Sequence, residues 1–175
     1  MDWLEIKEFL KDSIKMIAFI AVVLFLFIYV ISITQVVGNS MSPTLQSGEI
    51  LLLNKLKYRL SDVKRGDIIS LDYADTKYLI KRVIGLPGDT VSIRNSVVYI
   101  NNEEYKEAYL SQDLQYADFS LEDIGYSVIP DNMYLVLGDN RVDSLDGRDI
   151  GLISKEEING KISLRFWPLN KIKLF

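Results

Sequence analysis

The chain contains no histidine and no cysteine among its 175 residues. Without histidine it cannot form a Ser-His-Asp triad, a Cys-His pair or a zinc site of the HExxH type. Without cysteine it can form neither disulfides nor thiolate metal sites, although a cysteine-free chain can occur in either redox compartment. If the protein is a hydrolase, its general base must therefore be lysine, aspartate, glutamate or tyrosine.

The charge balance narrows the function further. The sequence has 20 basic and 24 acidic residues, which gives a formal net charge of −4. Proteins that bind nucleic acid normally show a basic excess gathered on one face. We therefore expect no nucleic-acid partner. The length leaves room for one modest domain and one membrane segment.

One long stretch, residues 16–48, contains no Asp, Glu, Lys or Arg. Its apolar part, roughly 14–33, is about long enough to cross a ~30 Å hydrocarbon layer as a helix. A cleavable signal peptide has a shorter apolar region that ends at a small-residue cleavage site, whereas Thr34-Gln35-Val36 follows here. We predict an uncleaved transmembrane helix at 14–33.

Flanking charges predict the orientation of this helix. Lys7, Lys11 and Lys15 precede the apolar core, and the next basic residue is Lys55. Because cytoplasmic flanks carry the excess of lysine and arginine, we expect a single-pass plasma-membrane protein with residues 1–13 cytoplasmic and 34–175 extracytoplasmic. Residues 1–15 fit a short amphipathic helix on the membrane surface and a solvated extension of the transmembrane helix about equally well.

The remaining sequence predicts a mostly β, antiparallel domain, because short apolar runs rich in β-branched residues alternate with Gly, Pro and Asn turn signals. The expected strands are 49–54, 67–73, 78–84, 90–93, 97–100, 134–137 and 162–166. Residues 103–128 are acidic and rich in tyrosine without a clear period. We expect them to form a surface insertion in which a short helix is possible.

Two clusters contain a candidate nucleophile and a candidate base. Ser40 lies between Gly38 and Pro43, which restrict the backbone as a fixed, exposed nucleophile requires, although the cluster alone is more typical of an ordinary loop serine. Lys81 lies in an apolar strand beside Arg82. An inward-facing lysine would be desolvated and could act as a base near neutral pH. A solvent-facing lysine whose stem packs on the sheet is the more ordinary alternative.

A third cluster, residues 138–148, is mostly glycine and polar residues directly after an apolar strand. This composition favours a loop held by its own hydrogen bonds and ion pairs. Asp139, Asp143 and Asp146 also suggest calcium. However, the loop lacks EF-hand spacing, and two interleaved arginines oppose a cation. We expect no metal.

Together these clusters resemble the type I signal peptidase family. The segments Ser40–Thr44, Lys81–Asp89, Gly138–Arg141 and Ile158–Ile162 with Phe166-Trp167-Pro168 occur in the family's order, over about residues 35–170. The short chain with one anchor resembles the compact form typical of Gram-positive bacteria. The resemblance implies a single barrel-like β-sheet domain of the signal peptidase type, removal of signal peptides from secretory preproteins after Ala-x-Ala sites, and no cofactor.

The resemblance also implies a role for each matching residue. Ser40 would be the nucleophile and its backbone N–H an oxyanion donor, while Lys81 would be the general base. Ser144 would orient the lysine amine, Asp146 and Arg148 would form a supporting ion pair, and Arg82 would pair with acidic residues of that loop. Relatives line shallow substrate pockets at positions that here are Val36, Gly38, Met41, Leu79 and Ile80, and also Leu45, which could equally be core.

The sequence departs from the family's pattern at Gly38, which lacks the hydroxyl some relatives use as a second oxyanion donor, and at Val142, Asp143 and Gly147. Two alternatives remain open at this stage. A self-cleaving repressor also uses serine and lysine, but would have a DNA-binding domain where this chain has its apolar segment. A catalytically silent, membrane-tethered binding protein would usually lack the serine or the lysine.

Overall fold

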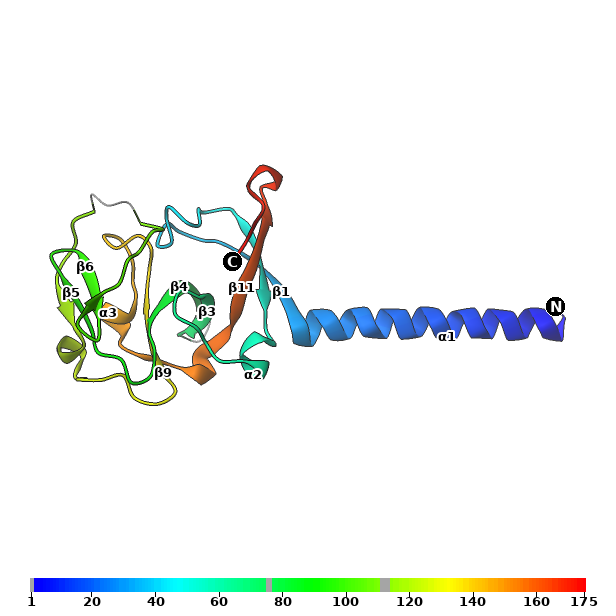
Figure 1. The fold of residues 1–175 in the computed structure, drawn as a ribbon. Coiled ribbons are helices and arrows are strands. Elements are labelled where there is room, and N and C mark those ends of the chain that lie inside the picture. Colours follow the sequence, from blue (N-terminus) through cyan, green and yellow to red (C-terminus); the bar gives the residue numbers. More distant parts are fainter. Residues whose placement is uncertain (1, 75–76, 111–113) are drawn as a thin grey trace.

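The computed structural model describes residues 2–74, 77–110 and 114–175. A long N-terminal helix leads into a β domain and projects away from it (Figure 1). The helix α1 spans Trp3–Phe25 and continues as a π-helical segment, Leu26–Val30. The whole of Trp3–Val30 is 28 residues long, has a mean hydropathy of 2.6 over its most apolar window, and buries none of that window. At 1.5 Å per residue it measures about 42 Å, which is enough to cross a membrane.

The boundaries of this helix differ from those expected. The charged N-terminal residues continue α1 without a break, so they extend the apolar helix and do not form a separate surface helix. The helix ends at Val30 and not at Ile33. Ile31–Gln35 instead form strand β1, which pairs antiparallel with β2, Ile50–Asn54. The β-branched residues of β1 favour this pairing, which provides hydrogen-bond partners for the backbone after it leaves the helix.

The larger sheet has the strand order β1-β2-β11-β3-β4-β9-β10, with β12 also paired to β11. Every one of these pairings is antiparallel. The bounds of the strands not yet given are β3 Ile68–Tyr73, β4 Lys77–Gly85, β9 Met133–Leu137, β10 Ile153–Ser154, β11 Ile158–Trp167 and β12 Lys173–Leu174. Each strand expected from the sequence is present to within a few residues.

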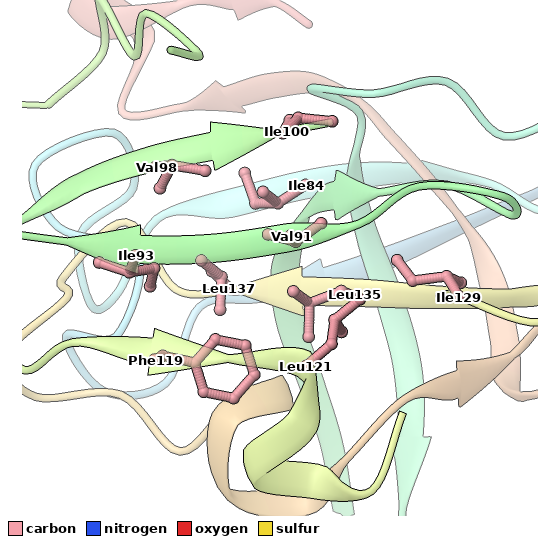
Figure 2. Packing of buried hydrophobic residues seen from close by; sticks show 10 residues of the cluster. All are labelled: Ile84, Val91, Ile93, Val98, Ile100, Phe119, Leu121, Ile129, Leu135 and Leu137. Carbon is pink, nitrogen blue, oxygen red and sulfur yellow. The ribbon is translucent and has the colours of Figure 1, made fainter. Parts of the chain in front are cut away.

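A second, smaller sheet has the order β7-β6-β5-β8. Its strands are β5 Val91–Arg94, β6 Val97–Ile100, β7 Glu103–Glu104 and β8 Phe119–Ser120. The mostly β, antiparallel fold is confirmed, but the strands divide between two sheets and do not form one. The buried side chains of β5 and β6 pack against Ile84, Leu135 and Leu137 of the larger sheet, so one core joins the two sheets (Figure 2).

Residues 103–128 contribute more than the expected surface insertion. They supply β7, β8 and a 3₁₀ helix, Leu121–Ile124. Phe119 and Leu121 are buried, with 7% and 2% of their surface exposed, in the core between the sheets. The segment therefore closes one side of that core. The sequence does not predict this burial, because the apolar residues of the segment are isolated among acidic and polar neighbours.

Short helical turns connect several strands. They are α2 Lys57–Leu60, α3 Gly147–Ile150, and the 3₁₀ turns Lys155–Glu157 and Leu169–Lys171. The larger sheet packs apolar side chains on both faces, since Ile68 joins one cluster and its neighbour Ile69 joins another. The cluster around Ile68 also contains Met41 and Leu45. This cluster fixes the loop between β1 and β2, on which Ser40 lies.

Candidate active site

Ser40 lies in a turn that two buried apolar side chains hold against the core. Met41 and Leu45, which follow Ser40 in the turn, are 1% and 0% exposed. The N–H of Ser42 donates to the carbonyl of Asn39 at 3.0 Å, and Gly38 adopts a left-handed φ of +85° that favours glycine. Among the residues that the structure describes, the backbone N–H of Ser40 donates no hydrogen bond. The turn thus holds a partly exposed serine beside a free backbone donor.

Lys81 is buried in the middle of β4, where it pairs with Ile69 of β3, and only 1% of its surface is exposed. Desolvation lowers the pKa of its ammonium group from 10.5 to about 8. The negative charge of Asp146 opposes this change in pKa, and the positive charge of Arg148 assists it. A pKa of about 8 leaves roughly a tenth of the lysine neutral at pH 7, whereas almost none is neutral in an exposed lysine.

The loops of Ser40 and Ser144 meet at Gly138. The pairing of Arg82 with Leu137 places Gly138 next to Lys81 along the same antiparallel register. A Cβ atom added to Gly138 would lie 2.5 Å from the carbonyl oxygen of Ser40 and 2.1 Å from Oγ of Ser144. The N–H of Asn140 also donates to the carbonyl of Ser40 at 2.9 Å. The loop of Ser40 and the loop of Ser144 are therefore in direct contact just after the end of β9, where Leu137 pairs with Arg82.

The hydroxyl of Ser144 is unusual in this setting. Its Oγ atom is buried and has no hydrogen-bond partner among the described residues. A buried hydroxyl without a partner costs free energy, and most native structures avoid it. An unpaired hydroxyl in this loop could form a hydrogen bond with a lysine amine, whether that amine is protonated or neutral.

Asp146 and Arg148 hold the loop that contains Ser144. Asp146 is fully buried, caps α3 by accepting from the N–H of Arg148, and accepts from the N–H of Gly138 at 2.9 Å. The guanidinium of Arg148 donates to the two carboxylate oxygens of Asp146 at 2.9 and 3.0 Å. This one carboxylate thus fixes both ends of the loop from Gly138 to Arg148.

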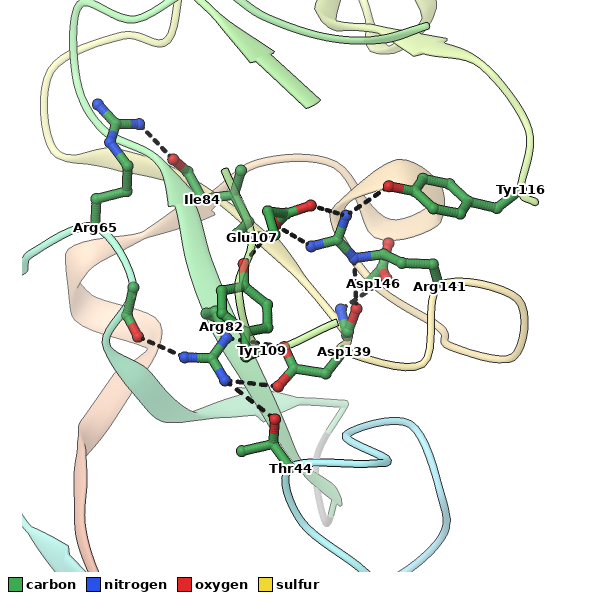
Figure 3. Close-up of polar contacts among 12 residues, drawn as sticks. Thr44, Arg65, Arg82, Ile84, Glu107, Tyr109, Tyr116, Asp139, Arg141 and Asp146 are labelled. Carbon is green, nitrogen blue, oxygen red and sulfur yellow. Dashed lines mark hydrogen bonds and ion pairs between the residues drawn. The ribbon is translucent and has the colours of Figure 1, made fainter. Parts of the chain in front are cut away.

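Arg82 connects the strand of Lys81 to the same loop. Its guanidinium makes a two-pronged ion pair with Asp139, with N···O distances of 2.8 and 2.6 Å, and donates to the carbonyl of Gly66 at 2.9 Å. The ring of Tyr109 stacks on it at 3.8 Å from the guanidinium carbon (Figure 3). Asp139 is fully buried, and Arg82 neutralises its carboxylate. The ion pair therefore holds the loop against β4.

Sequence reasoning missed a further brace, between Arg141 and Glu107. Arg141 is 2% exposed, its Nε donates to the carbonyl of Gly138 at 2.9 Å, and its two terminal nitrogens bind the two carboxylate oxygens of Glu107 (Figure 3). The hydroxyl of Tyr116 is a third partner, at 3.2 Å. The acidic, tyrosine-rich character of 103–128 beside an arginine-rich loop was the available signal, but it does not show which residues pair.

The residues expected to line substrate pockets only partly gather. Val36 and Met41 lie in one buried cluster, and Ile80 packs against it, while Gly38 is exposed. Leu45 belongs to the same cluster and is fully buried. Leu79 packs against a different cluster, with Ile69 and Leu71, because successive side chains of β4 point to opposite faces of the sheet. The structure does not bring Leu79 to the others.

The departures from the family pattern have simple structural settings. Val142 is 65% exposed, and Asp143 is exposed in a turn where its N–H donates to the carbonyl of Asn140. Neither side chain touches the core of the loop. A Cβ atom at Gly147 would lie 2.7 Å from Leu135 and 2.8 Å from the carbonyl oxygen of Val136. Glycine at 147 therefore allows α3 to pack directly on β9.

Gly138→Ala is expected to lower the free energy of unfolding by about 1–3 kcal/mol, because the added methyl group overlaps the Ser40 carbonyl and the Ser144 side chain. Thermal unfolding followed by circular dichroism measures the effect. The double variant Gly138→Ala/Ser144→Gly should recover part of the loss, because one of the two overlaps disappears. Unchanged unfolding of Gly138→Ala would mean that the two loops are not in this contact.

The chain is similar to known proteins over most of its length. Residues 7–167 match the family described as signal peptidase, peptidase S26. The chain is 38% identical over 160 residues to signal peptidase I of Bacillus caldolyticus, which covers 87% of this chain and 88% of that one. It is 35% identical over 180 residues to signal peptidase IB of Staphylococcus aureus, which covers 95% and 94% of the two chains.

A solved structure gives the same result. The crystal structure of a signal peptidase I from Enterococcus faecalis superposes with a TM-score of 0.54 at 34% sequence identity, over 59% of this chain and 98% of that one. The family match spans most of α1 and the β domain through β11, including the two loops that meet at Gly138. The chain belongs to the signal peptidase family of serine peptidases, peptidase S26.

Proposed function

We propose that this protein is a membrane-anchored endopeptidase that removes N-terminal signal peptides from secretory preproteins, with Ser40 as nucleophile and Lys81 as general base. The observation that supports this most strongly is the buried Lys81, whose pKa falls to about 8, beside the loop in which Ser144 Oγ lacks a partner and the Ser40 carbonyl is held. Neither a buried lysine nor an unpaired buried hydroxyl adds stability, so both indicate catalysis.

The reaction would begin when neutral Lys81 takes the proton of the Ser40 hydroxyl and Ser40 Oγ attacks the scissile carbonyl carbon. The developing oxyanion would accept a hydrogen bond from the backbone N–H of Ser40. The Lys81 ammonium would return the proton to the leaving amine as the C–N bond breaks, which leaves an acyl-enzyme. Water, activated by Lys81, would then hydrolyse the ester and release the signal peptide.

Ser144 and the arginine pairs would act by holding Lys81 in place. The unpaired Oγ of Ser144 would accept a hydrogen bond from the amine of Lys81. This bond would orient the amine so that the lone pair of Lys81 Nζ points at the hydroxyl of Ser40. Asp146, fixed by Arg148, would keep the Ser144 loop against Gly138. Arg82 and Asp139 would hold the same loop against β4.

The substrate would bind as an extended strand. β1 pairs only with β2, and β4 pairs with β9 only from Arg82 onward, so both have unpaired backbone on one side among the described residues. A peptide could add to either edge. Val36, Met41 and Ile80 lie beneath that position in one apolar cluster. Side chains of this bulk beneath the substrate would favour small substrate residues, as cleavage after Ala-x-Ala requires.

The apolar α1 would anchor the enzyme in the plasma membrane. The three lysines before its apolar core favour a cytoplasmic N-terminus, and the β domain would then be extracytoplasmic. Only a short stretch separates Val30, at the end of the helix, from Ser40. The active site would therefore lie close to the outer membrane surface, where the end of a signal peptide emerges.

The experiment is cleavage of a secretory precursor with an Ala-x-Ala site by the full chain in detergent or lipid, with the cut located by mass spectrometry. The proposal predicts one cut, after the second alanine, and no cut when that alanine is replaced by leucine. A chain that binds the precursor without cutting it would instead be a silent member of the family.

A further inference from the structure

A pocket of about 740 Å³ lies where α1 joins the β domain, away from Gly138 and the loops around it. Ile28 and Tyr29 of the last helical turn form one wall, and Ser32 and Thr34 of β1 continue it. Residues of β2, β3, β4, β11 and α2, together with Lys55 and the 3₁₀ turn Lys155–Glu157, complete the lining. Figure 1 shows β1 and α2 at the end of the domain that faces α1. None of the residues assigned to catalysis lines this pocket.

The charge of the pocket is positive in a protein whose net charge is −4. Three basic residues, Lys55, Arg59 and Lys155, line it together with one acidic residue, Glu156. Lys55 Nζ donates to the carbonyl of Ile28 at 3.3 Å, and Lys155 reaches only the exposed Asp62, at 3.9 Å. Arg59 has no ion-pair partner in the described part of the chain. Two cations of the pocket therefore have little or no compensation from the protein.

The depth of the pocket relative to the membrane follows from α1. The last turn of a membrane-spanning helix lies at the interface, where tyrosine is enriched. Tyr29 is in that turn, and it lines the pocket together with Tyr58, Tyr78 and several hydroxyl side chains. The pocket would thus open at the level of the lipid headgroups. Cations and hydroxyl groups together suit a phosphate that carries a polyol.

We propose that this pocket binds the headgroup of an anionic phospholipid, with the phosphate between Arg59 and Lys155 and the acyl chains along the exposed apolar surface of α1. The proposal rests on α1 spanning the membrane, which is part of the proposed function. A lipid held there would fix the angle between α1 and the β domain. It would do so through the helix end and β1, the strand that leads to Ser40.

The test measures lipid binding without any substrate. Full-length protein is purified in a neutral detergent, titrated with phosphatidylglycerol or phosphatidylcholine, and examined by native mass spectrometry for bound lipid. The variant Arg59→Gln/Lys155→Gln is compared with Arg94→Gln/Lys106→Gln, which removes the same charge. Arg94 is on β5, which Figure 1 shows at the opposite end of the domain from α1, and Lys106 follows β7 of the same sheet.

Wild type and the Arg94/Lys106 variant should both retain one phosphatidylglycerol molecule in preference to phosphatidylcholine. The Arg59/Lys155 variant should bind it roughly 30-fold more weakly, as two basic residues near an anionic surface typically contribute. Equal lipid affinity of the two double variants would overturn the proposal. The proposal would also be overturned if soluble glycerol phosphate displaced bound phosphatidylglycerol as effectively as phosphatidylglycerol itself does, because the site would then recognise free phosphate.

A third outcome separates this pocket from a substrate site. If the Arg59/Lys155 variant binds lipid normally but raises KM for a precursor, the pocket holds the preprotein and the lipid proposal is wrong. Because lipid binding is read without cleavage, loss of the lipid site and loss of peptidase activity are distinguishable. A catalytically inactive chain that still selects phosphatidylglycerol would support the site and contradict only the proposed function.

Discussion

Replacing Ser40 with alanine is expected to lower kcat/KM for an Ala-x-Ala precursor by about 10³-fold or more, because the covalent route requires its Oγ. The side chain is only partly buried, and no hydrogen bond of its Oγ holds the turn together among the described residues. The variant should therefore fold and unfold like wild type. The measurement is initial-rate cleavage of the precursor, together with thermal unfolding.

Ser42→Ala is the matched control, since it removes a hydroxyl from the same turn two residues along the chain. It should retain activity within a few-fold of wild type. Equal loss in the two variants would mean that the turn as a whole, and not Ser40 as a nucleophile, supports cleavage. Full activity of Ser40→Ala would contradict the assignment directly.

Lys81→Met is expected to abolish cleavage to a similar degree while leaving stability at pH 7 unchanged or higher. Methionine keeps the length and apolar stem of lysine but has no base. In the folded protein the pKa of Lys81 falls from 10.5 to about 8, so the unfolded chain binds this proton more tightly. The resulting penalty is fully present below pH 8 and disappears as the pH rises past 10.5.

The substitution removes that penalty, so the free energy of unfolding at pH 7 should rise by on the order of 1–3 kcal/mol. An inactive variant of equal or greater stability is the signature of a catalytic group retained at a cost in stability. Chemical denaturation at pH 7 and pH 10 measures it, and the gain should be smaller at pH 10. A variant that is both inactive and strongly destabilised would indicate a structural role for Lys81.

The sequence predicted most of the fold because the strands of the β domain alternate with clear turn signals. It failed at β1, where the apolar run passes from helix into Ile31–Gln35 without a break in hydrophobicity. Hydropathy alone cannot locate that change, since both segments are apolar; the β-branched residues of β1 were the only local indication. It failed again at 103–128, where single buried side chains such as Phe119 lie among polar neighbours.

The candidate site shows a similar division. Ser40, Lys81 and Ser144 were identified from local motifs, and in the structure the loops of Ser40 and Ser144 meet at Gly138. The partners of the arginines come from distant parts of the chain, as Glu107 does for Arg141. Such pairs depend on tertiary packing, and one sequence contains no signal that links their members. Leu79 packs against a different cluster from Val36, Met41 and Ile80, because neighbouring residues of β4 point to opposite faces, and the motif alone does not show which face each one takes.

The pH dependence of kcat/KM for precursor cleavage by wild type tests the central claim most directly, because this parameter reports ionisation of the free enzyme. The chain has no histidine or cysteine, the side chains that most often titrate near neutrality. An inflection near neutrality therefore has few sources besides Lys81. We expect kcat/KM to rise about tenfold per pH unit below pH 8 and to level off above an apparent pKa of about 8. A profile that is flat from about pH 5 to 9 would contradict a lysine base.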